Sequence, residues 1–96
     1  MTDKRNITLI LRENKARLIT KYHLTSIGVF GSFTRDDFRD DSDIDILIEY
    51  DQPMGIEFID LAGELENLLK RPVDLVSRNG IKPKYFKEIQ KDLMYF

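Results

Sequence analysis

The stretch Asp43-Ile44-Asp45-Ile46-Leu47-Ile48-Glu49-Tyr50 decides the fold of this chain. Its β-branched and aliphatic residues favour a β-strand. Side chains alternate between the two faces of a strand, so the three isoleucines point one way, while both aspartates and Leu47 point the other. At ~3.3 Å per residue, the Cα atoms of the two aspartates lie ~6.6 Å apart. The sequence therefore predicts a strand that begins with a pair of carboxylates on one face.

Residues on either side of this strand predict the rest of an α/β (α+β) domain. Apolar residues at helical spacing indicate helices, and short apolar runs between turn residues indicate strands. The helices are expected over residues 3–22, 56–70 and 83–92, and the further strands over residues 26–30 and 73–76. Residues 93–96 either end the last helix or add an edge strand.

A helix joins the second and third expected strands, so we expect these two strands to be parallel, with a right-handed crossover. The fold class is then a small mixed β-sheet of three to four strands packed with three to four helices. A chain of 96 residues has room for one such domain, over residues 1–96.

Composition limits the class of protein further. Hydrophobic residues make up 42% of the chain and charged residues 33%, which is typical of a globular domain with a modest core. The absence of cysteine excludes a disulfide framework, a thiol nucleophile and a thiolate metal site. No apolar run approaches the ~20 residues of a membrane helix, and the N-terminus does not resemble a secretory signal. We expect a cytoplasmic protein that does not bind a membrane.

The net charge of −2 conceals an uneven distribution along the chain. Residues 1–34 and 70–96 each carry a net charge of +4, whereas residues 35–69 carry −10. Nonspecific binding to nucleic acid needs an excess of lysine and arginine to neutralise phosphates, so the acidic balance argues against it. The acidic middle segment requires an explanation of its own.

A third aspartate, Asp74, interrupts the apolar run of residues 73–76. If that strand lies beside the strand of Asp43 and Asp45, three carboxylates gather on one patch of the sheet. Two charges ~5 Å apart repel by roughly 3 kcal/mol at an effective dielectric constant of ~20, so the cluster needs protonation, exposure to water or a divalent cation. Oxygen ligands suit Mg²⁺ or Mn²⁺. The alternatives are solvent-facing cap residues for the Asp-x-Asp pair and a salt bridge for Asp74.

The pair Gly31-Ser32 follows the first expected strand and is expected to open a short helical turn. Glycine lets a phosphate approach the backbone, and serine donates from its hydroxyl and its N–H. Ten residues separate Ser32 from Asp43. If the first two strands are neighbours, the turn and the aspartates meet at the same end of the sheet. The alternative is an ordinary strand-ending turn.

Several other side chains fit two roles each. Arg35 and Arg39 are the only cations of residues 35–69, and they either contact phosphates or neutralise neighbouring aspartates. Lys82 and Lys84 either face a partner or form a solvated basic surface. The aromatic residues near the C-terminus favour core or dimer packing over base stacking. These residues are Tyr85, Phe86, Tyr95 and Phe96.

Taken together, the motifs resemble the DNA polymerase beta-like nucleotidyltransferase superfamily, and above all its minimal nucleotidyltransferase (MNT) branch. The resemblance rests on Gly31-Ser32, ten residues, Asp43-Ile44-Asp45, an apolar strand and a later strand with Asp74. It covers about residues 22–92. The further matching segments are Arg35, Ser42, Pro72-Val73-Asp74-Leu75-Val76 and Gly80-Ile81-Lys82-Pro83.

The resemblance implies two Mg²⁺ ions, with Mn²⁺ as an alternative, held by Asp43, Asp45 and Asp74, and a nucleoside triphosphate near Gly31 and Ser32. The family reaction is attack on the α-phosphate of a nucleotide, which transfers a nucleotidyl group and releases pyrophosphate. MNT proteins are typically antitoxins encoded beside a HEPN-domain ribonuclease toxin, and some transfer AMP from ATP to a tyrosine of that toxin. ATP as substrate and a HEPN toxin as partner are therefore what the resemblance implies for this chain.

Two functional hypotheses follow, and a third is weaker. In the first, the chain is a metal-dependent nucleotidyltransferase in which Asp74 also helps to deprotonate the acceptor hydroxyl. In the second, it is a binding module, an antitoxin that neutralises its partner by docking alone, because 96 residues leave no separate domain for an acceptor. The third is an acidic scaffold without a ligand. The sequence leaves open the acceptor, the preferred base and the choice between a monomer and a homo-oligomer.

Overall fold

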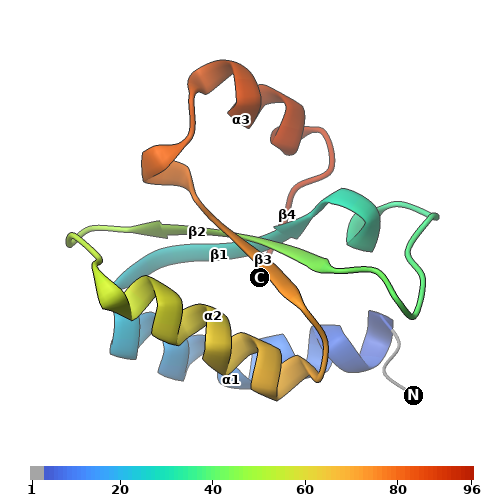
Figure 1. Cartoon of the computed structure of the whole chain (residues 1–96), viewed down its shortest axis with the longest axis horizontal. Coiled ribbons are helices and arrows are strands. Elements are labelled where there is room, and N and C mark those ends of the chain that lie inside the picture. The colour runs from blue at the N-terminus through green and yellow to red at the C-terminus, as the bar shows by residue number, and fades with distance from the viewer. Residues whose placement is uncertain (1–3) are drawn as a thin grey trace.

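The computed structural model describes residues 4–96, which form one four-stranded sheet with helices on both faces (Figure 1). The elements are α1 (Lys4–Tyr22), β1 (Leu24–Phe30), the 3₁₀ turn η1 (Gly31–Thr34), β2 (Ile44–Tyr50), α2 (Ile56–Leu69), β3 (Val73–Ser77), the 3₁₀ turn η2 (Arg78–Gly80), α3 (Pro83–Gln90) and β4 (Met94–Tyr95). The expected α+β domain with a small mixed sheet is confirmed. Within this part of the chain, no helix is both long and apolar enough to cross a lipid bilayer.

The expected boundaries agree with the structure to within two residues. β1 begins at Leu24 rather than at residue 26, because Leu24 already pairs with Tyr50 of β2. α3 ends at Gln90 rather than at residue 92. The C-terminal segment forms the edge strand β4, which pairs with β1. The expected start of the first helix at Asp3 lies outside the described residues.

The strands lie in the order β3-β2-β1-β4. β1 is antiparallel to both β2 and β4, whereas β2 and β3 are parallel. A parallel pair needs a long crossover connection, and α2 provides it between β2 and β3. The expected parallel pairing of these two strands is confirmed, and β2 is an inner strand with a neighbour on each side.

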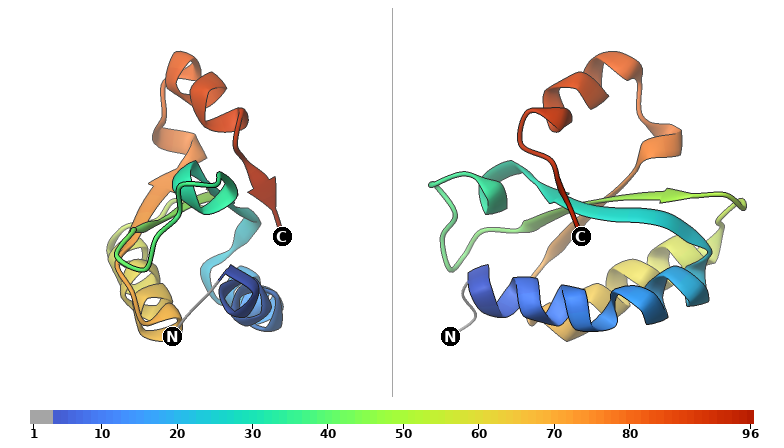
Figure 2. Two further views of the ribbon diagram at one scale, coloured as in Figure 1. Left: turned by 90° about the vertical axis from the view of Figure 1, so that its right-hand side faces the viewer. Right: turned by 180° about the vertical axis from the view of Figure 1, so that it is seen from behind.

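The two faces of the sheet are covered by different helices. α1 and α2 lie side by side on one face, and α3 stands over the other (Figure 2). The three isoleucines of β2 are fully buried beneath α1 and α2. Leu47 is buried on the opposite face, where it packs with Phe30 of β1 and Ile89 of α3. The alternation expected for β2 is therefore observed, and it turns Asp45 toward the α3 face.

The turn after α2 fixes how β3 enters the sheet. Lys70 adopts the left-handed conformation (φ 57°), and its N–H donates to the carbonyl of Glu66 at 2.8 Å. Such a residue ends a helix and reverses the chain. Two residues later, the carbonyl of Pro72 accepts the N–H of Ile44 at 3.0 Å, just ahead of the parallel ladder. This bond joins the start of β2 to the residue before β3 and so helps to set the register of the pair.

The loop of residues 35–43 is anchored to the body of the domain by Arg71. The guanidinium Nη1 of Arg71 donates to the carbonyls of Arg39 (2.9 Å) and Ser42 (2.8 Å). The same guanidinium lies 4.7 Å from the ring centroid of Phe38. These contacts hold the segment that leads into β2, and so they position the two aspartates at its start.

Candidate active site

Asp45 and Asp74 lie directly opposite each other in the parallel pair of β2 and β3. Adjacent strands are ~4.8 Å apart, and residues directly opposite each other in a pair point to the same face. Both side chains therefore lie on the α3 face, at the end of the sheet where β2 and β3 begin. Asp45 is half-buried, whereas Asp74 is exposed. The structure thus brings together two of the three carboxylates that the sequence predicted would gather here.

The surroundings of Asp45 change its acidity. Its pKa is raised to about 6, first by burial and then by the charge of Asp74, a side-chain hydrogen bond with Asp74 and the charge of Asp43. A like charge beside a carboxyl group disfavours its ionised form. Asp45 therefore accepts a proton, or another cation, more readily than an isolated aspartate does.

Asp43 occupies the position just before β2 and is exposed. Its charge contributes to the raised pKa of Asp45, so the two groups share one electrostatic environment. Within residues 4–96, however, no three or more histidine, aspartate or glutamate side chains gather closely enough to hold a metal ion. Asp45 and Asp74 form the close pair, and Asp43 flanks it from the water side, where repulsion between like charges is smallest.

Gly31 lies against the carboxylate of Asp45. Phe30 of β1 pairs with Asp45 of β2, and Gly31 follows Phe30 in the chain with φ +69°. A β-carbon at this position would collide with Oδ2 of Asp45 and would stand 3.1 Å from its Cγ. Position 31 therefore needs glycine both for its backbone conformation and for space. The expectation that the Gly31-Ser32 turn and the aspartates meet at one end of the sheet is met.

Ser32 is the second residue of η1 and is partly buried. Its carbonyl accepts the N–H of Arg35 at 3.1 Å, and the hydroxyl of Thr34 donates to the carbonyl of Gly31, also at 3.1 Å. These two bonds close the turn on itself. The expected helical turn after the first strand is thus a 3₁₀ turn, and it presents Gly31 and Ser32 beside the start of β2.

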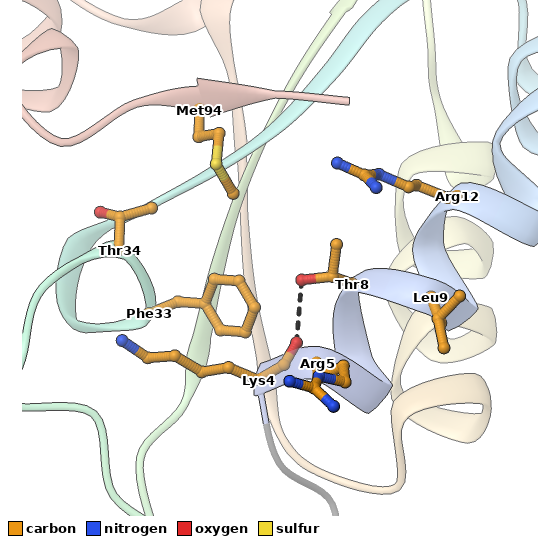
Figure 3. Close-up of a pocket in the computed structure, with 8 residues that line it drawn as sticks. All are labelled: Lys4, Arg5, Thr8, Leu9, Arg12, Phe33, Thr34 and Met94. Atoms are coloured by element: carbon orange, nitrogen blue, oxygen red, sulfur yellow. Dashed lines mark hydrogen bonds between the residues drawn. The ribbon is translucent and has the colours of Figure 1, made fainter.

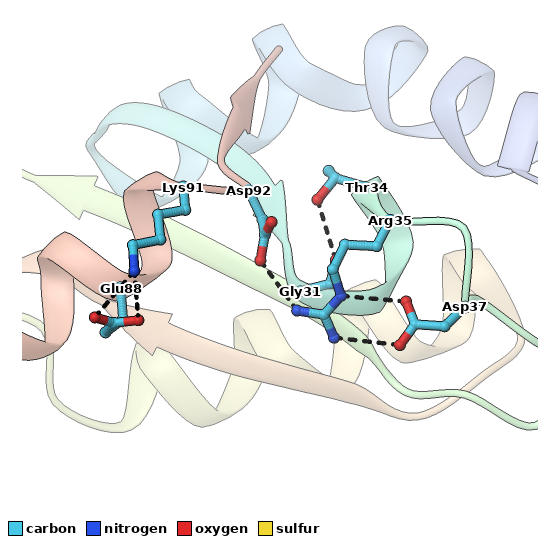
Figure 4. A network of polar contacts seen from close by, with 7 residues as sticks. All are labelled: Gly31, Thr34, Arg35, Asp37, Glu88, Lys91 and Asp92. Atoms are coloured by element: carbon cyan, nitrogen blue, oxygen red, sulfur yellow. Dashed lines mark hydrogen bonds and ion pairs between the residues drawn. The ribbon is translucent and has the colours of Figure 1, made fainter.

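Arg35 connects the turn to α3 through a network of charges (Figure 4). Its guanidinium binds Asp37 through Nε at 3.2 Å and Asp92 through Nη1 at 3.0 Å. Of the two roles considered for Arg35, the structure shows the neutralisation of acids. The hydrogen bond from Arg35 also lowers the pKa of Asp37. Sequence reasoning did not single out Asp92, because this residue lies 57 positions from Arg35 in the chain.

A pocket of about 460 Å³ lies between the turn η1 and α3. Gly31, Arg35 and Asp45 form one wall, and one side of α3 with the residues just after it forms the other. The second wall consists of Tyr85, Glu88, Ile89, Lys91 and Asp92, and Phe30 completes the lining. A volume in this range suits a small-molecule ligand. The contribution of α3 was missed at the level of sequence, although the spacing of Tyr85, Glu88 and Asp92 is that of one helical face.

A larger hollow of about 640 Å³ lies on the other side of η1 (Figure 3). Lys4, Arg5 and Arg12 of α1 surround it, and Phe33 and Thr34 of η1 form part of its wall. None of the three aspartates lines it. Its cations and apolar surface do not offer ligands for a metal, so the smaller pocket with Gly31 and Asp45 is the better candidate for chemistry.

Comparison with known families identifies the domain. The sequence profile of the nucleotidyltransferase domain family matches residues 10–95. This chain belongs to that family. The nucleotidyltransferase domain also shares 37% identity over 90 residues with the protein adenylyltransferase MntA of Thermococcus cleftensis, a match that covers 93% of this chain and 91% of the relative.

Solved structures share the fold of this chain. A structure provisionally named a minimal nucleotidyltransferase superposes with a TM-score of 0.82 and 28% identity, over 96% of this chain and 94% of that one. A chain from a complex of the tri-AMPylated HEPN toxin of Shewanella oneidensis with an MNT antitoxin superposes with a TM-score of 0.61 and 25% identity. That match covers 96% of this chain and 66% of the other. The fold expected from the family resemblance is thus confirmed.

Proposed function

We propose that this nucleotidyltransferase domain is a Mg²⁺-dependent protein adenylyltransferase. It transfers AMP from ATP to a hydroxyl group of a partner protein, and it acts as the antitoxin of a HEPN ribonuclease toxin. The observation that carries the proposal is the meeting of Asp45 and Asp74 on one face of the sheet, with Asp45 directly against Gly31. The names of the Thermococcus and Shewanella proteins support the protein acceptor and the HEPN partner.

The residues present suit a divalent cation. Asp45 and Asp74 offer only carboxylate oxygens, and burial together with their mutual repulsion raises the pKa of Asp45, a strain that a bound cation would relieve. Oxygen donors of this kind select Mg²⁺ or Mn²⁺. In the proposed enzyme, Asp43, Asp45 and Asp74 would hold two such ions. Bound there, Mg²⁺ supplies neutralisation of the charge that develops on the phosphate oxygens.

The chain itself contributes position and proton transfer. Because Gly31 has no side chain, the carboxylate of Asp45 packs directly against the turn, and both residues line the pocket in which we place the phosphates. The guanidinium of Arg35 lies on the same wall of the pocket, where it exchanges Asp37 and Asp92 for phosphate oxygens. Holding the reactants in line accounts for most of the rate enhancement in phosphoryl transfer.

In the transfer step, AMP passes from ATP to a hydroxyl group of the partner protein. The acceptor hydroxyl oxygen forms a bond to the α-phosphorus of ATP while the bond from that phosphorus to the bridging oxygen breaks. Pyrophosphate leaves with the electron pair of the broken bond. The carboxylate of Asp74, which is exposed at the edge of the sheet, accepts the proton of the hydroxyl. An edge position leaves Asp74 open to an acceptor supplied by another protein.

The proposal is tested by co-expression with the HEPN protein of the neighbouring gene, followed by intact mass of both proteins. We expect the partner to gain the mass of one or more AMP units, and purified protein to transfer label from α-labelled ATP. Asp43→Ala should abolish the transfer while circular dichroism shows an intact fold. Asp60→Ala, which removes an exposed carboxylate from α2, is the matched control and should leave transfer unchanged. Full transfer by Asp43→Ala would overturn the proposal.

A second candidate function is neutralisation by docking alone. It is favoured because no three acids converge on a metal site within the described residues, and because Arg35 is engaged by Asp37 and Asp92. In this case the double variant Asp43→Ala/Asp45→Ala would neutralise the toxin as well as the wild type does. Loss of neutralisation, with the complex still formed, would instead establish the chemical route.

A further inference from the structure

We propose that Tyr85 of α3 is the stacking platform for the base of the bound nucleotide, and thus a specificity-determining residue of the pocket. This inference rests on the proposed function, because it requires a nucleotide at the Gly31–Asp45 site. It assigns the far end of the pocket to the nucleobase and the end near Arg35 to the phosphates.

Tyr85 differs from the neighbouring aromatic residue of α3 in its surroundings. Phe86 packs against the core cluster around Leu47, and the guanidinium of Arg78 lies 3.8 Å from its ring centroid. Tyr85 is 61% exposed, and within residues 4–96 it makes no hydrogen bond, ring contact or ion pair. A large apolar ring left open on the wall of a pocket is a surface on which a flat, apolar group can stack.

The position of Tyr85 along α3 matches the length of a nucleotide. Tyr85 and Glu88 lie on the side of α3 that lines the pocket, and Asp92 follows in the turn just after the helix ends at Gln90. At a rise of ~1.5 Å per residue, the helix and this turn span about 10 Å from Tyr85 to Asp92. Asp92 binds Arg35, which is beside the turn that begins with Gly31. A ribose can bridge this distance, with the phosphates at Gly31 and Arg35 and the base at Tyr85.

The charges in the pocket favour the same orientation of the nucleotide, with its phosphates near Arg35 and its base near Tyr85. The end of the pocket near η1 offers the guanidinium of Arg35, which attracts phosphate. Tyr85 carries no charge and offers a π-face, which every base can use regardless of its hydrogen-bonding edge. Because of this ring, we expect the protein to bind a nucleotide more tightly than a phosphate chain of the same charge that lacks a base.

The first test exploits the absence of tryptophan from the chain. Tyr85→Trp introduces a single indole, whose fluorescence reports on stacking, and the protein is titrated with ATP or with inorganic tripolyphosphate in the presence of Mg²⁺. We expect ATP to quench the indole and tripolyphosphate to leave it nearly unchanged. Tyr95→Trp, at another exposed tyrosine that lies on β4 outside this pocket, is the matched control and should respond to neither ligand.

The second test compares affinities by calorimetry. Tyr85→Ala should weaken ATP binding by about tenfold and leave the binding of tripolyphosphate unchanged, whereas Tyr85→Phe keeps the ring and should retain wild-type affinity for both. Equal ATP affinity in the wild type and in Tyr85→Ala, or loss of tripolyphosphate binding in Tyr85→Ala, would overturn the role of Tyr85 while the proposed function stands. Labelling of Tyr85 itself by AMP would also overturn it, since the ring would then be an acceptor. If the wild type binds no ATP, both proposals are wrong.

Discussion

The carboxylate of Asp45 lies against Gly31, in the space that a β-carbon at position 31 would occupy. The contact joins the end of β1 to the start of β2 on the face where α3 stands. It means that the turn and the acidic strand form one unit. A change at Gly31 therefore acts on the candidate site directly as well as on the stability of the fold.

The first prediction concerns Gly31→Ala. The substitution places a side chain at φ +69° and drives its β-carbon into Asp45, so we expect a loss of about 2 kcal/mol in the free energy of unfolding. The stabilising shift that Mg²⁺ and ATP give the wild type in thermal unfolding should disappear, because the displaced carboxylate no longer faces the turn. Urea denaturation and thermal unfolding measure the two effects.

The matched control for this variant is Gly63→Ala. Gly63 lies inside α2, where an added β-carbon would meet nothing within 4 Å, and its φ is not positive. Alanine there should raise stability by roughly 0.5–1 kcal/mol, since glycine costs about that much inside a helix, and the response to ATP should persist. A Gly31→Ala protein as stable as the wild type would contradict the close contact with Asp45.

The strand of the aspartates was predictable from the sequence because its signal is local. Alternation along β2 sets the face of Asp45, and the isoleucines on the other face leave only one orientation that buries them. The position of Gly31 followed from spacing once β1 and β2 were taken as neighbours. These features depend on residues close together in the chain, where periodicity carries the information.

The register of Asp45 with Asp74 was not predictable in the same way. It depends on where α2 ends, through the left-handed residue Lys70 and the bond from Ile44 to the carbonyl of Pro72. A shift of one residue would have turned Asp74 to the other face. The helical spacing of α3 likewise defines a face of that helix but not the partner it covers, so Tyr85 and its neighbours entered the site only with the structure.

The second prediction concerns the ion pairs between α1 and α2. The carboxylate of Glu64 binds Arg17 and Lys21, and it accepts the hydroxyl of Tyr22 at 2.7 Å. The hydrogen bond from Arg17 is the largest cause that lowers the pKa of Glu64 from 4.5 to about 2. An acid whose pKa is lower in the folded than in the unfolded state stabilises the fold at pH values above its unfolded pKa. For Glu64, this stability is lost as the pH falls from about 4.5 through 2.

Glu64→Gln should therefore lower the free energy of unfolding at pH 7 by about 1 kcal/mol, a value reduced by the exposure of both cations. The difference from the wild type should shrink toward zero as the pH approaches 2. Asp60→Asn changes an exposed acid on the same helix that makes no ion pair within residues 4–96, and it should have no such effect. Denaturant unfolding over this pH range tests the prediction, and a constant difference at all pH values would refute it.

The third prediction separates the stability of the domain from its chemistry at Asp45. Burial and the neighbouring Asp74 raise the pKa of Asp45 to about 6, so its ionised form is disfavoured in the folded state. An acid whose pKa is higher in the folded than in the unfolded state stabilises the fold at low pH. For Asp45, this stability is fully present below the unfolded pKa of about 3.8 and is lost as the pH rises through 6. Asp45→Asn removes the charge without changing the size of the side chain. We expect this substitution to raise the free energy of unfolding at pH 7.5 by about 1–2 kcal/mol, a value reduced by the partial exposure of the carboxylate. Below pH 4 there should be no gain. The substitution should also abolish AMP transfer.

Denaturant unfolding at the two pH values and transfer of label from ATP measure these effects of Asp45→Asn. Asp41→Asn, in the exposed loop before β2, is the matched control and should change neither stability nor transfer, because its carboxylate faces water. The stability of Asp45→Asn shows whether the carboxylate of Asp45 serves ligand binding or the stability of the fold. A gain in stability means that the carboxylate is strained in the free protein and kept for ligand binding, whereas a protein less stable than the wild type at pH 7.5 would show that Asp45 is a structural carboxylate.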